Sequence, residues 1–149
     1  YEQLIFMKRY QAAFACTSYE YADEEGIGLG KFAHVPERIT YEQAIKNTII
    51  FTSTVLLDLS QLPKDEIQMP EIESEDTATW WKILRGGHVA YGLDQALVRY
   101  RRPAISLSSN KIRAIRRVWH LYRSEEQFSI MKSAYCFVHY AVRATLRRL

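Results

Sequence analysis

The sequence predicts an α/β fold made of a few strands with flanking helices and two helices at the end of the chain. Strand-like and helix-like segments alternate along the first two thirds of the sequence. The 149 residues, 48% of them hydrophobic, are enough for one domain with a core. The expected strands are few for a complete doubly wound sheet and the chain begins with Tyr1, so we expect part of a longer protein.

A helix, a pair of strands and a short second helix are expected first. Residues 1–13 mix apolar and polar positions as an amphipathic helix does. Aromatic and β-branched residues over 12–21 are typical of a strand, and a turn with three glycines leads to a returning strand over 31–35. Thr40 can cap a short helix over 41–46.

A buried strand, an acidic helix and two further strands are expected next. Residues 48–59 are apolar and β-branched, which favours a buried strand. Ser74 can cap a helix over 75–85, which two glycines end. The segments 88–93 and 96–102 are predicted to be strands joined by a turn.

Two basic helices are predicted at the end of the chain, over residues 111–123 and 129–149. We therefore divide the chain into a first part over 1–102 and a basic helical segment over 103–149 that packs on it. The two cysteines, at positions 16 and 136, lie far apart in apolar surroundings, which indicates buried free thiols.

Charge is divided sharply along the sequence. Residues 1–98 contain 8 Lys and Arg against 15 Asp and Glu, whereas residues 99–149 contain 12 against 2. The two parts therefore carry net charges of −7 and +10. This asymmetry indicates an anionic partner for the C-terminal part, such as phosphates, nucleic acid or a lipid surface.

The stretch MPEIESEDTATWWKIL, residues 69–84, allows a structural and a chemical interpretation. Acids in the first turn of a helix stabilise its positive end, and the tryptophans that follow suit a buried stripe. Alternatively, a carboxylate that is fixed at the start of a helix, such as Asp76, can accept a proton. By themselves, these residues favour the structural interpretation.

An ordered set of short motifs runs over nearly the whole chain. It begins with EQLIFM and AFACTSYEYADEEG, and it continues with Pro36, Ile39, Tyr41, Ser53–Val55, Glu75, Asp76, Trp80 or Trp81, Gly87, Ala90–Leu93, Leu97, Tyr100, Arg101, Ser106 and Ser108. No single motif is specific, but the order resembles the C-terminal half of a family 2 glycosyltransferase. These are bacterial, nucleotide-sugar-dependent enzymes with a Rossmann-like GT-A fold.

The resemblance implies inverting transfer of a sugar from a nucleotide-sugar to a saccharide or lipid-linked acceptor in cell-surface polysaccharide synthesis. It places the enzyme in the cytoplasm, at the inner face of the membrane. Asp76 matches the family's base, which deprotonates the acceptor hydroxyl. The family's Asp-X-Asp motif, which holds Mg²⁺ or Mn²⁺ on the donor diphosphate, has no match here. We therefore expect the metal ligands outside this chain, and the chain alone to be inactive.

Further site residues are implied beside the base. Glu75 is expected to contact donor or acceptor, and Asn47 and Thr52–Thr54 to line the acceptor cleft. Trp80 and Trp81 are adjacent and cannot share one helix face. One is expected in the core, while the other either stacks on a sugar ring or also packs.

The segment YRRPAISLSS has two interpretations. It is either a strand end with a proline stop and a serine cap, or a loop that closes over the donor. In the second case Arg101 or Arg102 meets the diphosphate, because a guanidinium matches phosphate geometry. Ser106 and Ser108 would add hydroxyl groups to this loop.

The basic helices also leave alternatives open. A stripe of large residues recurs at helical spacing beside arginines, as in helices that lie on an anionic membrane: Ile112, Ile115, Trp119 and Tyr122. The helices can instead pack on the sheet, or pair with a second copy of the chain. The arginine cluster also suits a nucleic-acid-binding module, although the acidic first part argues against one. The remaining alternative is a non-catalytic interaction domain.

Overall fold

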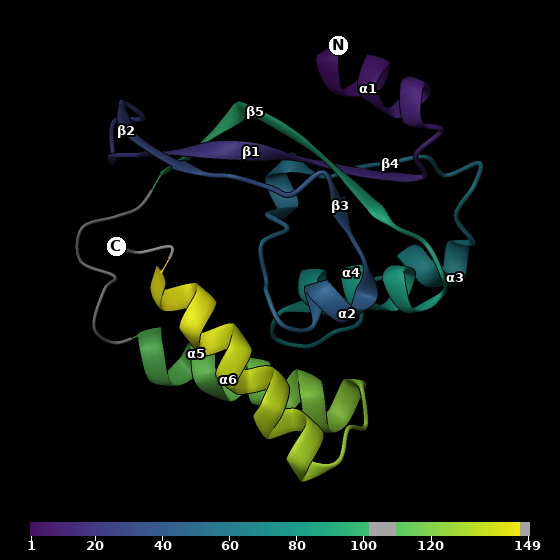
Figure 1. Ribbon diagram of the computed structural model, residues 1–149, viewed down its shortest axis with the longest axis vertical. Coiled ribbons are helices and arrows are strands. Elements are labelled where there is room, and N and C mark those ends of the chain that lie inside the picture. Colours follow the sequence, from purple (N-terminus) through teal and green to yellow (C-terminus); the bar gives the residue numbers. More distant parts are fainter. Residues whose placement is uncertain (102–109, 147–149) are drawn as a thin grey trace.

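The computed structural model describes residues 1–101 and 110–146 (Figure 1). Its elements are, in chain order, helix α1 (Glu2–Tyr10), strands β1 (Phe14–Ala22), β2 (Gly28–Ala33) and β3 (Arg38–Ile39), helix α2 (Tyr41–Ala44), the 3-10 turn η1 (Thr52–Thr54), strand β4 (Leu56–Leu57), helices α3 (Lys64–Ile67) and α4 (Glu75–Arg85), strand β5 (Ala90–Arg101), helix α5 (Asn110–His120), the π-helical turn η3 (Leu121–Glu125) and helix α6 (Ile130–Leu146).

A mixed sheet of five strands forms the centre of the fold, which confirms the α/β prediction. The strand order is β2-β1-β5-β3, and β4 pairs with the beginning of β1. The two long central strands, β1 and β5, run parallel, whereas the outer strands pair antiparallel. Helix α1 lies on one side of the sheet, and α2, α4 and the α5–α6 pair lie on the other (Figure 1).

Strand β5 runs unbroken from Ala90 to Arg101, so the predicted turn near Gly92–Gln95 is wrong. The polar residues Asp94 and Gln95 form a bulge instead, because the pairing of β5 with β1 shifts register between Thr17 and Ser18. Asp94, on this bulge, accepts a hydrogen bond from the Ser18 hydroxyl at 2.6 Å, and its carboxylate lies 2.7 Å from the His34 Nδ1 atom. These two hydrogen bonds lower the pKa of Asp94.

The predicted buried strand over residues 48–59 is also wrong, because only Leu56 and Leu57 pair with the sheet. The Thr54 hydroxyl donates to the Phe51 carbonyl at 2.7 Å, which closes a tight turn in place of a strand. The Gln3 side chain, from α1, donates to the Thr54 carbonyl at 2.7 Å. The turn is thus tied to the first helix, and Thr52 is left beside α4.

One hydrophobic core joins the sheet, α4 and the C-terminal helices. Phe14, Trp81 and Tyr122 are each at most 1% exposed and come from β1, α4 and η3. The Trp81 ring stacks on Tyr122 with ring centres 5.3 Å apart. The Tyr122 hydroxyl donates to the Ile45 carbonyl, so the π-helical turn is anchored to the segment after α2.

A buried carboxylate ties the same elements together by polar contacts. The Glu126 side chain, 2% exposed, accepts hydrogen bonds from the Tyr41 hydroxyl and from Arg85 Nη1, the latter at 2.8 Å. Burial and the neighbouring Glu126 raise the pKa of Tyr41, which keeps its hydroxyl protonated as a donor. The end of α4 and the start of α2 are thereby fixed to the C-terminal helices.

Candidate active site

A hollow of about 440 Å³ lies where the start of α4, the segment before η1 and the C-terminal helices meet. The sheet contributes the end of β5, and α5 and α6 form the opposite wall. The residues that line the hollow are Thr48, Ile50, Phe51, Ser74, Glu75, Asp76, Thr77, Tyr100, Ala114, Arg117, Val118, Leu121 and Tyr140.

Asp76 lies on the wall of this hollow with both carboxylate oxygens hydrogen-bonded. Its Oδ2 accepts from the Thr52 hydroxyl at 2.6 Å, and its Oδ1 accepts from the Thr77 backbone N–H at 2.6 Å. Because one partner belongs to η1 and the other to α4, the carboxylate is fixed between two segments. Each oxygen keeps further acceptor capacity for a hydroxyl that enters the hollow.

The chain enters α4 through an unusual turn. Ser74 occupies the N-cap position with a left-handed backbone (φ 66°), and its side chain makes no capping hydrogen bond, so the expected serine cap is not formed. Asp76 takes the Thr77 N–H itself, at the positive end of the helix. The predicted bounds of α4, residues 75–85, are confirmed.

Both tryptophans of α4 are in the core, at 4% exposure for Trp80 and 1% for Trp81. Trp80 packs against Phe14 with ring centres 5.4 Å apart, and Trp81 stacks on Tyr122. Stacking of either ring on a sugar does not fit this packing, because neither ring borders the hollow of Asp76. Of the residues expected beside the base, exposed Glu75 lines the hollow.

The expected diphosphate loop lies largely outside the described residues, since Arg102, Ser106 and Ser108 belong to the segment 102–109. Arg101 is exposed at the end of β5, and its Cδ atom lies near Gly26 of the β1–β2 turn. It does not line the hollow of Asp76, whereas its neighbour Tyr100 does.

Arg117 of α5 is a site residue that the sequence interpretation missed. It lines the hollow of Asp76, and its Nε atom is buried without a hydrogen-bond partner in the described part of the chain. The signal was available: Ala114, Arg117, Val118 and Leu121 follow the 3-4-7 spacing of one helix face. Three residues of the stripe of larger side chains, Ile112, Ile115 and Trp119, are exposed, whereas its fourth member, Tyr122, is buried.

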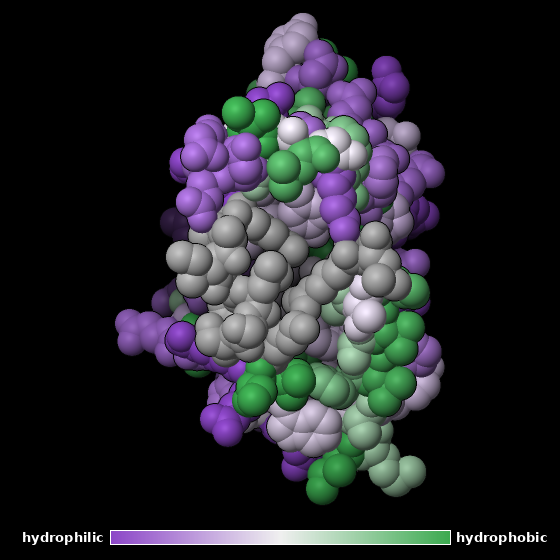
Figure 2. Space-filling view, turned by 90° about the vertical axis from the view of Figure 1, so that its left-hand side faces the viewer, coloured by the Kyte–Doolittle hydropathy of each residue, from purple (hydrophilic) through white to green (hydrophobic). Residues whose placement is uncertain are grey.

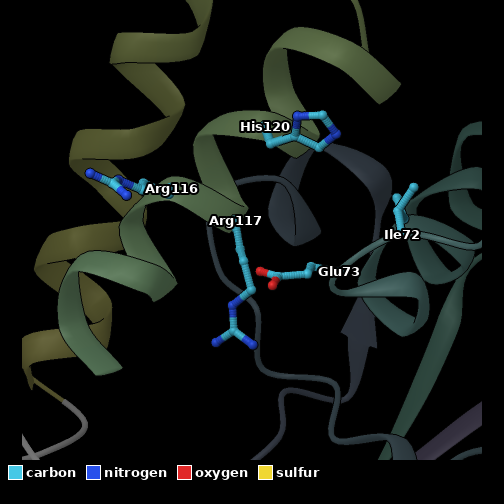
Figure 3. Close-up of a pocket in the computed structure, with 5 residues that line it drawn as sticks. All are labelled: Ile72, Glu73, Arg116, Arg117 and His120. Carbon is cyan, nitrogen blue, oxygen red and sulfur yellow. The ribbon is translucent and has the colours of Figure 1, made fainter. Parts of the chain in front are cut away.

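Two further hollows adjoin the first one at Arg117. The inner hollow, of about 290 Å³, reaches Tyr19 and Tyr21 of the sheet. The outer hollow, of about 410 Å³, is bordered by Ile72, Glu73, Arg116, Arg117 and His120 (Figure 3). Arg113 lies at the same rim, with its Nη2 2.6 Å from Glu73 Oε1.

Metal-binding and membrane-spanning features are absent from the described residues. Residues 1–101 and 110–146 contain no group of three or more His, Cys, Asp or Glu side chains that could hold a metal ion. None of the helices in these two ranges combines the length and hydrophobicity needed to cross a bilayer.

Comparison with known proteins shows what kind of chain this is. It is 43% identical over 149 residues, 99% of its length, to TuaG of Bacillus subtilis, a glycosyltransferase assigned to teichuronic acid biosynthesis. The chain is homologous to bacterial glycosyltransferases. It is also 31% identical over 118 residues, 78% of its length, to WfgD of Escherichia coli. WfgD is named as a UDP-Glc:α-D-GlcNAc-diphosphoundecaprenol β-1,3-glucosyltransferase.

The similarity covers only part of each relative. The chain spans 58% of TuaG and 45% of WfgD. It also spans 56% of WfaP of Escherichia coli, which is named for the same activity as WfgD and is 29% identical over 145 residues. No protein-family model matches the chain, and no solved structure matches it. The resemblance found in the sequence is thus confirmed at the level of bacterial glycosyltransferases.

Proposed function

We propose that this chain is the acceptor-side half of an inverting family 2 glycosyltransferase with a GT-A fold. The whole protein would move a sugar from a nucleotide-sugar donor to a saccharide or lipid-linked acceptor in cell-surface polysaccharide synthesis. The observation that carries this proposal is Asp76, a carboxylate fixed on the wall of a 440 Å³ hollow. The activities for which WfgD and WfaP are named support the choice of substrates.

Asp76 would act as the general base. It takes the proton of the acceptor hydroxyl while that oxygen attacks the anomeric carbon, and the nucleoside diphosphate leaves from the opposite face. Thr52 and Thr77 hold the carboxylate in place, so little reorganisation is needed when the acceptor binds. Glu75 lines the same wall, which supports its proposed contact with the sugars.

A divalent cation on the donor diphosphate belongs to the same proposal, with its ligands outside this chain. The described residues do not fit a metal site, and the proposed proton transfer uses none. The donor site would lie in the part of the relatives that this chain does not match. Residues 1–149 alone are therefore proposed to be inactive.

The test is a transfer assay with the full-length protein. UDP-glucose and other nucleotide-sugars would be offered with N-acetylglucosaminyl-diphosphoundecaprenol, and with free saccharides, in the presence of Mg²⁺ or Mn²⁺. We expect a product with an inverted anomeric centre, identified by mass spectrometry and by proton NMR of the new linkage. Retention of configuration, or no transfer from any nucleotide-sugar, would overturn the proposal.

The outer face of α5 and α6 supports a peripheral contact with the membrane. Large apolar side chains are exposed along both helices, from 36% for Trp119 to 84% for Met131: Ile112, Ile115, Trp119, Ile130, Met131, Tyr135, Val138, Val142 and Leu146. Figure 2 shows hydrophobic side chains gathered at the lower end of the molecule, where these helices lie. Neither helix contains an acid, so an anionic lipid surface fits this face.

Vesicle sedimentation tests this contact, which would place the enzyme at the cytoplasmic face of the membrane. Full-length protein should bind vesicles that contain phosphatidylglycerol, and the Val138→Asp, Val142→Asp double variant should bind several-fold less. Leu29→Asp, a change at an exposed apolar position on β2, is the control. If the face instead pairs with a second copy, the double variant would turn a dimer into a monomer and leave vesicle binding unchanged.

A further inference from the structure

Arg117 lies on the inner side of α5, among residues that pack toward the core. Val118 is 7% exposed and Leu121 is fully buried. The Arg117 Nε atom is buried and makes no hydrogen bond within the described residues. A buried donor on a charged group without an acceptor costs free energy, and native proteins rarely keep one. This placement points to a ligand that accepts hydrogen bonds from Arg117.

The position of Arg117 connects it with the proposed base. It borders all three adjoining hollows and shares the 440 Å³ hollow with Asp76 and Tyr100. The outer hollow is bordered by Arg117 together with Glu73 and His120, which are both exposed (Figure 3). A ligand held by Arg117 can therefore reach the side of the hollow where proton transfer is proposed.

The acid beside Arg117 is already engaged by another arginine. Glu73 Oε1 accepts two hydrogen bonds from Arg113, from Nε at 3.2 Å and from Nη2 at 2.6 Å. These bonds lower the pKa of Glu73, with Arg117 a smaller contributor. Figure 3 shows Arg117 extending past the Glu73 carboxylate, while Arg116 leaves α5 in another direction. Helix α5 itself contains no acid that could pair with Arg117.

We propose that Arg117 binds a diphosphate group of one of the two reactants. The planar guanidinium carries five hydrogen-bond donors in a fork. This fork matches the oxygens of a phosphate group, whereas it does not match a single sugar hydroxyl. This inference rests on the proposed function, in which a diphosphate occurs on the nucleotide-sugar donor and on a lipid-linked acceptor. In both reactants the diphosphate is attached to a sugar that takes part in the transfer, which suits a guanidinium in the same hollow as Asp76.

The test compares diphosphates with monophosphates in full-length Arg117→Gln. Two ligand pairs would be titrated by calorimetry: UDP against UMP, and geranyl diphosphate against geranyl monophosphate. We expect the variant to bind one diphosphate about 10- to 100-fold more weakly, as for a lost charged hydrogen bond, with a much smaller change for its monophosphate. A loss for UDP assigns Arg117 to the donor, and a loss for geranyl diphosphate assigns it to the acceptor.

Arg143→Gln, at an exposed arginine of α6 that borders none of the three hollows, is the control and should bind all four ligands as the wild type does. Unchanged diphosphate binding by Arg117→Gln overturns the inference, and so does an equal loss in the two variants. Should Arg117→Gln not fold, Arg117→Lys keeps the charge without the fork. A folded Lys variant with wild-type affinity for both diphosphates overturns the inference as well.

Binding is measured without transfer, so the two proposals can fail separately. A full-length protein that binds a diphosphate through Arg117 but transfers no sugar would overturn the proposed function alone. A protein that transfers sugar, and whose Arg117→Gln variant keeps its diphosphate affinity, would overturn only the assignment of Arg117.

Discussion

Single side chains fix the site through contacts that cross between segments. Asp76 depends on Thr52, which is 24 residues away in the chain, and the 3-10 turn that presents Thr52 is held by Gln3. Sequence spacing cannot reveal such contacts, because it shows only which residues share one helix or strand. The helix that carries Asp76 was predictable from the spacing of its apolar residues and from the glycines that end it, although Ser74 does not cap it, but the partner of the carboxylate was not predictable.

Glu126 is the polar residue that ties α2 and α4 to the C-terminal helices, and it does not line the hollow of Asp76. Glu126→Gln removes the negative charge that Arg85 faces and that also accepts from the Tyr41 hydroxyl. We expect a loss of about 1–3 kcal/mol in the free energy of unfolding, measured in urea. Glu42→Gln, which breaks an exposed 3.7 Å pair with Lys46, should cost less than about 1 kcal/mol. Equal losses in the two variants would contradict this account.

Cys16 gives the protein a pH dependence at alkaline pH. Burial raises the pKa of this thiol from 9.0 to about 12, so the folded state disfavours the thiolate. The resulting stability is fully present below pH 9 and is lost as pH rises from 9 towards 12, by about 1.4 kcal/mol per pH unit. Urea unfolding at several pH values should show a steeper loss for the wild type than for Cys16→Ala. Parallel curves would contradict the burial of this thiol.

Helices and strands were predictable where the spacing of the hydrophobic residues agreed with the residues that end the element or form the turn after it. Helix α4 has both, and its bounds agree with the prediction. Residues 48–59 have the composition of a strand, but the Thr54 hydroxyl and Gln3 stabilise a turn there instead. In β5 the polar residues around Asp94 looked like a turn, whereas parallel pairing with β1 absorbs them in a bulge. Both errors arise from tertiary contacts that override local preference.

Helix α4 should be the most sensitive element to loss of packing. Trp81 is 1% exposed and stacks on Tyr122, so Trp81→Ala would leave a cavity between α4 and η3. We expect a loss of about 3–5 kcal/mol in the free energy of unfolding. Trp119→Ala, at a 36% exposed position on α5, should cost much less. A Trp81→Ala variant as stable as Trp119→Ala would show that the ring is not a core residue.

At the scale of the whole molecule, the two oppositely charged parts of the sequence each contribute one wall of the hollow. Glu75 and Asp76 come from the part that carries a net charge of −7, and Arg117 from the part that carries +10. One hydrophobic core joins these two parts, so the acidic and basic walls are held on either side of the hollow. Such an arrangement suits a site that removes a proton on one side and binds a phosphate on the other.

The most direct measurement is transfer by full-length Asp76→Asn, with Glu71→Gln as the control because Glu71 is exposed and lies outside the hollow. Asparagine keeps the shape of the side chain and can still accept from Thr52, but it cannot take a proton. We predict that Asp76→Asn lowers kcat by about 10²- to 10⁴-fold. Its melting temperature and affinity for UDP should stay unchanged, and Glu71→Gln should transfer sugar at the wild-type rate. Wild-type turnover by folded Asp76→Asn would contradict the assignment of Asp76 as the base.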